Sequence, residues 1–270
     1  MPVKSLSKNT DDVEALRKAV DILENPRLTA QITHQIGRPI EAIIGSLPKS
    51  WSNRVVAVSE KTMTHALEFA VQTMDVERKP SKARRGAHTF AAITSGAVGG
   101  AAGFAGLAAE LPVSTTLMLR SIADIAHSEG EDLSEVENRM HCLLVFALGG
   151  PSVGDDAVET GYFAVRYALA RAVSEAAKHV SMYGVSGHAA PGIVHLIRMI
   201  STRFGVALSQ KAAAQMVPLL GAIGGAGVNY AFMEHFQHMA TGHFTVRRLE
   251  RAYGEEAVRK LYDEIKLELV

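Results

Sequence analysis

The sequence predicts an all-α protein, a multi-helix bundle with a central glycine-rich antiparallel helical hairpin. Apolar residues recur at steps of three and four along most of the 270 residues, and no stretch keeps the two-residue alternation of a half-buried strand. Two long apolar segments carry glycines at four-residue spacing, which stacks the glycines on one face of a helix. With 47% hydrophobic and 21% charged residues, the chain can bury a large core.

The first third of the chain contains three amphipathic stretches, each bounded by residues that start or stop a helix. The expected boundaries are a cap at Thr10 and Asp11, a stop before Pro26, a stop at Gly37, a start after Pro48 and a stop near Met74. Residues 75–86 follow as the one clear loop, and five of them are basic: Arg78, Lys79, Lys82, Arg84 and Arg85. We therefore expect an N-terminal helical region with a basic loop over residues 1–86.

Residues 87–270 are expected to form a helical core that packs with the N-terminal region into one compact domain. Residues 90–109 carry no charge and include five glycines, and Glu110-Leu111-Pro112 then interrupts them. The N–H that proline lacks would have no partner in the first turn of a helix, so a new helix is expected from Pro112 to about Ser128. Ser134 and Glu137 have the spacing of a capping box, which predicts a helix ending near Gly149.

Further helices are expected along the rest of the core. Their ranges are about 155–183, Pro191 through Arg203, a short helix after Ser209, the second glycine-rich segment from Pro218 onward, and a charged amphipathic tail over 254–269. Gly96 and Gly100 in the first glycine-rich segment repeat the spacing of Gly221 and Gly225 in the second. Each glycine costs up to about 1 kcal/mol relative to alanine in a helix, so we expect the two segments to compensate by packing closely on each other.

The glycine-rich segments allow three interpretations. Twenty uncharged residues reach the length of a membrane span, and small residues four apart are common between transmembrane helices. Alanine and glycine contribute little transfer energy, so a buried hairpin in a soluble protein is favoured. Interfacial association with an anionic bilayer stays open, because antiparallel packing would bring a second basic group to the end that carries the basic loop. This group is Arg247, Arg248 and Arg251, for which ion pairs with Glu250, Glu255 and Glu256 are the alternative.

Composition argues against several classes of protein. Twenty-eight basic residues balance twenty-eight acidic ones, so the chain has no overall field to attract nucleic acid, and no nucleic-acid partner is expected. The single cysteine, Cys142, lies in an apolar run and cannot form an intrachain disulfide. The first residues lack the apolar core of a secretory signal, so we expect a cytoplasmic protein. The motifs of a phosphate-binding loop and of a nucleophile elbow are missing.

Two long blocks resemble a known family. The run GAVGGAAGFAGLAAELPVSTTLMLRSIADIAHSEGEDL, Gly96 to Leu133, looks like the EcsC family signature of a glycine-rich helix, an acidic-Leu-Pro step and an arginine helix ending at Gly-Glu-Asp. The run VPLLGAIGGAGVNYAFMEHFQHMATGHFTVRRLERAYG, Val217 to Gly254, is similar to that family's closing block. The positions that match are Glu110, Pro112, Arg120, Gly130, Asp132, Pro218, Gly221, Gly225, Asn229, Phe244, Arg247, Arg248 and Tyr253.

This resemblance implies a helical bacterial protein of the cytoplasm with membrane or ABC-transporter association. It implies no catalytic residues. Our first hypothesis is therefore an accessory protein that is membrane-peripheral or associated with an ABC transporter and has no catalysis of its own. The expected partners are an anionic membrane surface or membrane transporter subunits, and self-association through the glycine-lined helix faces stays open as a further role.

The alternative is a metal-dependent hydrolase with a site between the two glycine-rich helices. His235 and His238 share one face of an expected helix, His243 lies eight residues after His235, and the three are the candidate ligands for a divalent metal, the only cofactor considered. Glu110, Arg120 and Asp124 are the candidates for catalysis. Arg120 and Asp124 are four apart and predict an intrahelical ion pair, and if this polar strip is buried, Glu110 and Asn229 are its natural partners.

Overall fold

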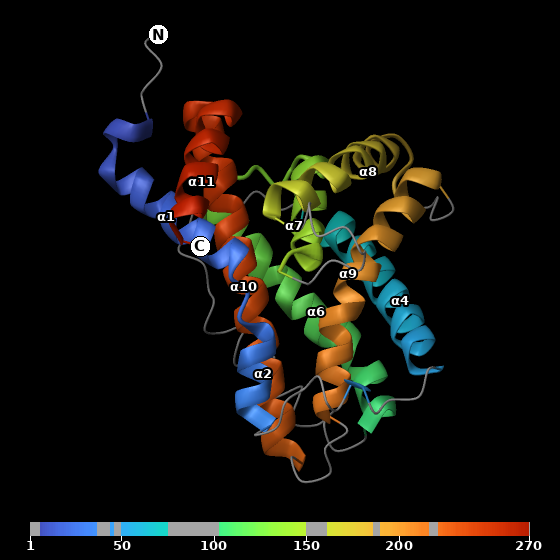
Figure 1. Cartoon of the computed structure of the whole chain (residues 1–270). Helices are drawn as coiled ribbons and strands as arrows, with labels where there is room; N and C mark the ends of the chain where they lie inside the picture. The colour runs from blue at the N-terminus through green and yellow to red at the C-terminus, as the bar shows by residue number, and fades with distance from the viewer. Residues whose placement is uncertain are drawn as a thin grey trace.

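The computed structural model describes residues 6–36, 44–45, 50–74, 103–149, 161–185, 190–215 and 221–269, and the regular structure in these ranges is helical (Figure 1). The prediction of an all-α fold is confirmed. The α-helices are α1 (Thr10–Glu24), α2 (Leu28–Ile36), α4 (Ser50–Thr73), α6 (Gly103–Ser128), α7 (Val136–Leu144), α8 (Tyr162–Tyr183), α9 (Pro191–Gln215), α10 (Gly221–Tyr253) and α11 (Glu255–Leu269). Short 3₁₀ helices cover Leu6–Lys8 and Val145–Ala147.

Helix α10 runs along the length of the bundle and is in contact with α1, α2, α6, α9 and α11 (Figure 1). Its buried face carries Phe232 and Phe236, which pack edge-on with ring centroids 5.7 Å apart. Phe146 from the segment after α7 and Phe204 from α9 join them, and Phe146 lies 5.1 Å from Phe236. These rings form an aromatic centre between helices that are distant in sequence, because each ring removes a large apolar area from water.

Several predicted boundaries change. The cap of α1 is Asn9, whose side chain accepts a hydrogen bond from the Asp12 N–H, rather than Thr10 or Asp11. The capping box at Ser134 does not form, because the Ser134 hydroxyl and N–H both donate to the Asp132 carboxylate, and α7 begins at Val136. Helix α9 continues through Arg203 to its end without a break, since buried apolar residues keep recurring every four positions.

Pro112 lies inside α6 instead of starting a helix. A proline in a helix interior removes one backbone hydrogen bond and strains the turn before it. Here the residues around it are held from outside the helix: Leu111 is buried, and Glu110 is bound by side chains of α9 and α10. The tertiary contacts therefore keep the helix continuous across a residue that usually interrupts one.

The described parts of the two glycine-rich segments run parallel, not antiparallel. Side chains of α6 and α10 meet at the pairs Glu110–Asn229, Ser121–Gln237 and Glu129–Arg248, so residue numbers rise together along both helices. Both helices rise in the same direction in Figure 1. An antiparallel hairpin of these two helices is therefore not what the described residues form, and the expectation that antiparallel packing brings both basic groups to one end loses its basis.

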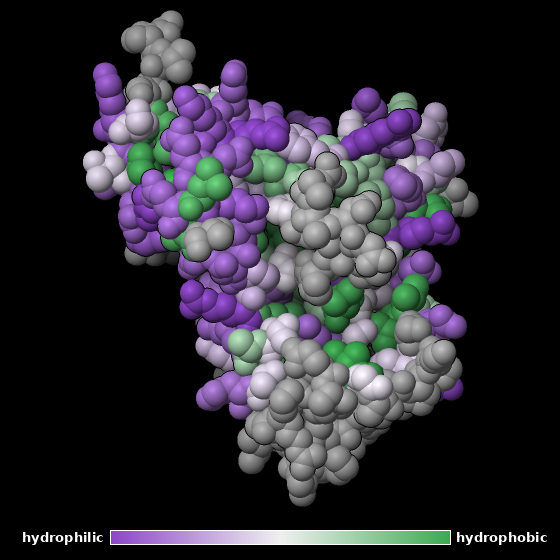
Figure 2. Space-filling view, in the orientation of Figure 1, coloured by the Kyte–Doolittle hydropathy of each residue, from purple (hydrophilic) through white to green (hydrophobic). Residues whose placement is uncertain are grey.

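The larger part of the first glycine-rich segment, residues 90–102, lies outside the described residues, as do Pro218 and the basic residues of 75–86. Among the described helices, none is both long enough and apolar enough to cross a bilayer. Figure 2 shows polar side chains over most of the α2, α10 and α11 side of the molecule, while apolar side chains gather nearer to α4 and α9.

Candidate functional site

Charged side chains pair at several buried or partly buried places among the described residues, and the most deeply buried is a cluster between α6, α9 and α10. We call Glu110, Ser114, Lys211 and Asn229 the lysine cluster. The Lys211 Nζ lies 3.0 Å from Glu110 Oε2 and 3.3 Å from Oε1, and the Asn229 amide donates to Glu110 Oε1 at 2.8 Å. Ser114 Oγ is 3.4 Å from the same Nζ. Each of the three helices thus contributes a polar group to one contact.

The lysine cluster is removed from water, since the side chains of Lys211 and Glu110 are only 0% and 5% exposed. Burial lowers the pKa of Lys211, and the charge and hydrogen bond of Glu110 oppose this shift. The Nζ also lies 5.3 Å from the centre of the Phe232 ring. Because the ammonium is surrounded by protein acceptors and an aromatic face, the cluster is suited to hold three helices in register.

Sequence reasoning found Glu110 and Asn229 in this cluster but not Lys211. It expected them to meet Arg120 and Asp124, whereas Arg120 is exposed and lies 5.1 Å above the ring of Phe69 on α4. A local pattern points to Lys211, because this single charge directly precedes three alanines, and all three alanines are buried.

A second such place is the carboxyl end of α10, where three arginines bind acidic groups from the amino-terminal part of the chain. We call Arg247, Arg248, Arg251 and their carboxylates the arginine cluster. Glu131, which follows α6, accepts two hydrogen bonds from Arg247, at 2.8 and 3.0 Å, and a further short one from Arg251. Arg248 bridges Glu129 and Asp12, each at 2.9 Å.

The prediction that these arginines pair with Glu250 and Glu255 is wrong. Glu250 instead binds Arg166 of α8 through two hydrogen bonds, and Glu255 accepts one from Tyr167. The physical reason is position: Glu250 lies three residues after Arg247 but points to α8, while the turn after α6 brings Glu131 against Arg247.

The arginine cluster is less isolated from water than the lysine cluster. Exposure rises from 1% at the Glu131 side chain through 17% at Arg247 to 42% at Arg251. Burial alone would raise the pKa of Glu131, but the hydrogen bonds and charges of Arg247 and Arg251 outweigh it and lower that pKa. These arginines are therefore bound to carboxylates of the protein itself, and they are less available to bind an anionic surface.

The three candidate metal ligands do not meet. His235 is buried against Gly149, where a Cβ atom would lie only 2.6 Å from the imidazole, and burial lowers the pKa of His235 to about 4. His238 is exposed, and His243 is buried at a different place. A separation of eight residues also places His243 about 12 Å along α10 from His235. Within the described ranges, no three His, Cys, Asp or Glu side chains are placed to share a metal ion.

His243 belongs to a buried pair of imidazoles that the sequence did not reveal. Its Nδ1 is hydrogen bonded to the Tyr162 hydroxyl at 2.8 Å, and its ring stacks on His141 with centroids 5.5 Å apart. The Nε2 atom of His141 lies 3.0 Å from a guanidinium nitrogen of Arg247. Burial, reinforced by neighbouring positive charge, lowers the pKa of both histidines well below the usual value, so both are neutral near pH 7.

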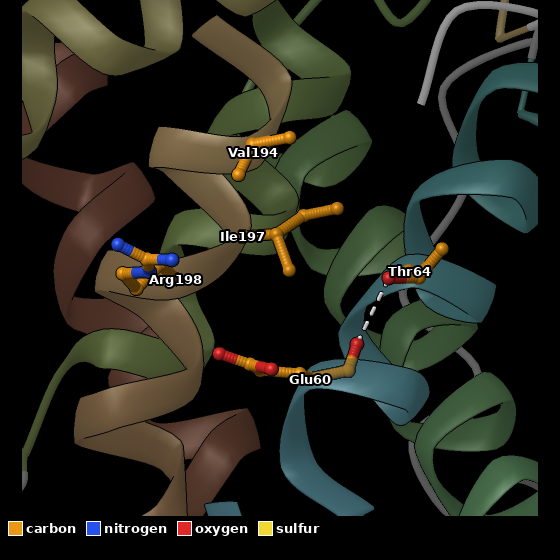
Figure 3. A pocket seen from close by; sticks show the side chains of 5 residues that line it. All are labelled: Glu60, Thr64, Val194, Ile197 and Arg198. Atoms are coloured by element: carbon orange, nitrogen blue, oxygen red, sulfur yellow. Dashed lines mark hydrogen bonds between the residues drawn. The ribbon is translucent and has the colours of Figure 1, made fainter. Parts of the chain in front are cut away.

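Hollows open between helices on the surface of the described part of the chain. A groove of 190 Å³ between α4 and α9 is lined by Glu60, Thr64, Val194, Ile197 and Arg198. Figure 3 shows the Glu60 side chain reaching from α4 toward α9, with the Thr64 hydroxyl bound to the Glu60 carbonyl at 2.9 Å. A larger hollow of 280 Å³ lies between α2 and α10. Neither is lined by the lysine cluster or the arginine cluster.

The fold and these contacts define a helical protein whose interior charges are paired between distant helices. The model of the EcsC protein family matches residues 3–249, so this chain belongs to the EcsC family. The match also includes the N-terminal helices, on which the resemblance of the two blocks did not depend. No curated protein and no solved structure matched the chain.

Proposed function

We propose that this EcsC-family protein is a non-catalytic accessory protein that docks on the anionic inner surface of a membrane. The observation that carries the proposal is the group of five basic residues within eight positions, directly before twenty uncharged residues. This group is Arg78, Lys79, Lys82, Arg84 and Arg85. A basic residue near an anionic bilayer contributes about 1 kcal/mol, so such a group is sufficient for reversible docking.

The internal contacts favour this group over the arginines of α10 as the docking element. Arg247, Arg248 and Arg251 are bound to Glu131, Glu129 and Asp12, as described above. Moving them to a membrane would break hydrogen-bonded ion pairs, of which the partly buried ones are expensive to separate. We therefore assign docking to the basic residues of 78–85 alone.

The lack of convergent chemistry supports a role without catalysis. In the part of the chain that the structure describes, the candidate residues Glu110, Arg120 and Asp124 do not gather with the histidines around a common hollow. No specific observation favours the metal-dependent hydrolase. A transporter subunit as the docking partner rests on the family resemblance, and the inner membrane surface is where such a subunit would be met.

Flotation with liposomes tests the proposal. Purified protein should float with anionic vesicles at low salt, stay in solution with neutral vesicles of phosphatidylcholine, and lose flotation as salt screens the basic group. Replacing Arg78, Lys79, Lys82, Arg84 and Arg85 by Gln should lower the fraction bound at least tenfold, since each residue contributes about 1 kcal/mol.

The matched control removes the same charge from exposed positions elsewhere. Its five substitutions to Gln are at Lys18, Arg54, Lys61, Lys178 and Lys260. We expect this variant to float nearly as the unmodified protein does. Equal losses in both variants would mean that only net charge matters, and unchanged flotation of the first variant would refute the assignment.

A further inference from the structure

The hollow between α2 and α10 has a charge pattern that the proposed membrane docking does not use. The two helices lie side by side (Figure 1), and small side chains, Ala30 and Ala231, form part of the wall and leave room between them. At 280 Å³ the hollow is near the lower limit of ordinary ligand pockets, so only a small group would fit. Its walls carry the carboxylate of Glu234, the guanidinium of Arg27, the imidazole of His34 and the aromatic ring of Tyr230.

The acidic group, Glu234, is held in place from both helices. Gln31 of α2 donates to Glu234 Oε2 at 2.6 Å, and the Tyr230 hydroxyl, one turn earlier on α10, donates to Oε1 at 3.1 Å. A carboxylate has about four acceptor positions, so two remain for a ligand. Tyr230 is exposed and also lines the hollow, where its ring can face a cation beside the carboxylate.

The basic group, Arg27, lies four residues before Gln31. Arg27 directly precedes α2, and its carbonyl accepts the Gln31 N–H at 2.9 Å, so its backbone lies about one helical turn, or about 5.4 Å, from that of the residue that binds Glu234. Its side chain is 75% exposed and makes a long contact of 3.4 Å with the carboxylate of Asp21, so donors of the guanidinium remain accessible to a ligand. Arginine is well suited to phosphate oxygens, which it can bind with two donors at once.

We propose that this hollow, the α2–α10 pocket, binds a phosphoethanolamine group. The ammonium would lie between the Glu234 carboxylate and the Tyr230 ring, and the phosphate would lie against Arg27. A two-carbon linker separates the two charges by about the distance of one helical turn. Arg27 and Glu234 would each meet the opposite charge of the ligand, whereas a plain anion or a plain amine would leave one of the two without its partner.

The same chemistry occurs in the headgroup of a phospholipid and in free phosphoethanolamine. The described lining of the site includes none of the basic residues of 78–85, so the two proposals rest on different side chains. Failure of membrane docking and failure of this site can therefore be told apart.

The groove between α4 and α9 provides a matched control within the same protein. It contains one acidic and one basic residue, Glu60 and Arg198, which approach from the two helices in Figure 3. Among the described residues, its lining has no aromatic ring, and no pair of donors comparable to Gln31 and Tyr230 binds the Glu60 carboxylate. Charge removal there should leave binding at the α2–α10 pocket unchanged.

The experiment is titration of the full-length protein with glycerophosphoethanolamine by calorimetry, with ethanolamine and inorganic phosphate as separate probes. We expect binding of the combined group and at least tenfold weaker binding of either half. Glu234→Gln and Arg27→Gln should each weaken binding about tenfold or more, because each removes one charge-assisted contact. Glu60→Gln should have no effect, and thermal unfolding checks that all variants are folded.

Three results would overturn the proposal: no binding at millimolar probe, equal binding of inorganic phosphate alone, or binding that survives both Glu234→Gln and Arg27→Gln. The source of the group is decided by flotation with neutral vesicles, with and without phosphatidylethanolamine. Flotation that requires this lipid and Glu234 supports a headgroup site. Binding of the free probe without such flotation supports a site for the free compound.

Discussion

The lysine cluster and the arginine cluster handle interior charge in different ways. Lys211 and Glu110 form one pair that is almost completely removed from water, and the other described residues that bind it, Ser114 and Asn229, are neutral. In the arginine cluster, three guanidinium groups share three carboxylates, and exposure rises gradually toward Arg251. A buried single pair has no replacement when one member is lost, whereas a shared network can redistribute its hydrogen bonds and admit water.

The largest effect is expected from Glu110→Gln. The substitution keeps the shape of the side chain but leaves the Lys211 ammonium without its counter-charge inside the protein. The free energy of unfolding should fall by about 3 kcal/mol, as is typical when one member of a buried pair is removed. Urea denaturation followed by circular dichroism measures the change.

The double variant Glu110→Gln/Lys211→Met is the control for that prediction. It removes both charges, and it should recover at least half of the loss. If the single variant is as stable as the unmodified protein, the cluster does not behave as a charged pair, and the contrast between the two clusters disappears.

A smaller loss, about 2 kcal/mol, is expected from Glu131→Gln, because hydrogen bonds to charged groups are worth about that much. Arg247 keeps its hydrogen bond to Asn138 at 2.9 Å, and Arg251 can turn toward water. The same denaturation experiment applies, with Glu137→Gln on the exposed face of α7 as control. A loss larger than that of Glu110→Gln would reverse the comparison.

Acidification should destabilise the folded protein. His141, His235 and His243 have pKa values lowered by burial, so the unfolded chain takes up protons near pH 6.5 that the folded chain does not. Stability is therefore full above about pH 6.5 and falls below it, by up to about 1.4 kcal/mol per pH unit for each histidine. Glu131, whose pKa is also lowered, adds to the loss only below its ordinary value of 4.5.

Denaturation at pH 7.5, 6.5 and 5.5 measures this dependence. His243→Asn should flatten it, while His238→Asn, which changes an exposed ring on the same helix, should leave the slope as it is. Equal slopes in all three proteins would show that the buried imidazoles do not control stability in this range.

The smallest effect, with the opposite sign, is expected beside the lysine cluster. The hydroxyl of Thr115 is buried and has no hydrogen-bond partner in the part of the chain that the structure describes. Thr115→Val should raise the free energy of unfolding by about 1 kcal/mol, because it removes a buried unsatisfied group. Thr116→Val is the matched change, and it should not stabilise, since that hydroxyl binds the Pro112 carbonyl at 2.8 Å.

The sequence by itself determined the helical class and most of the helices, because an amphipathic period of 3.6 residues is a local property that packing only has to use. It also identified Glu110 and Asn229 as interior polar groups, since polar residues on apolar helices require partners. The tertiary structure decided which partners they have. Lys211 is more than one hundred residues away from Glu110, and Glu131 reaches Arg247 only because α6 and α10 run parallel. Helix direction and the pairing of distant charges depend on how whole helices pack, so no local pattern contains them, and the continuity of α6 across Pro112 depends on the same contacts.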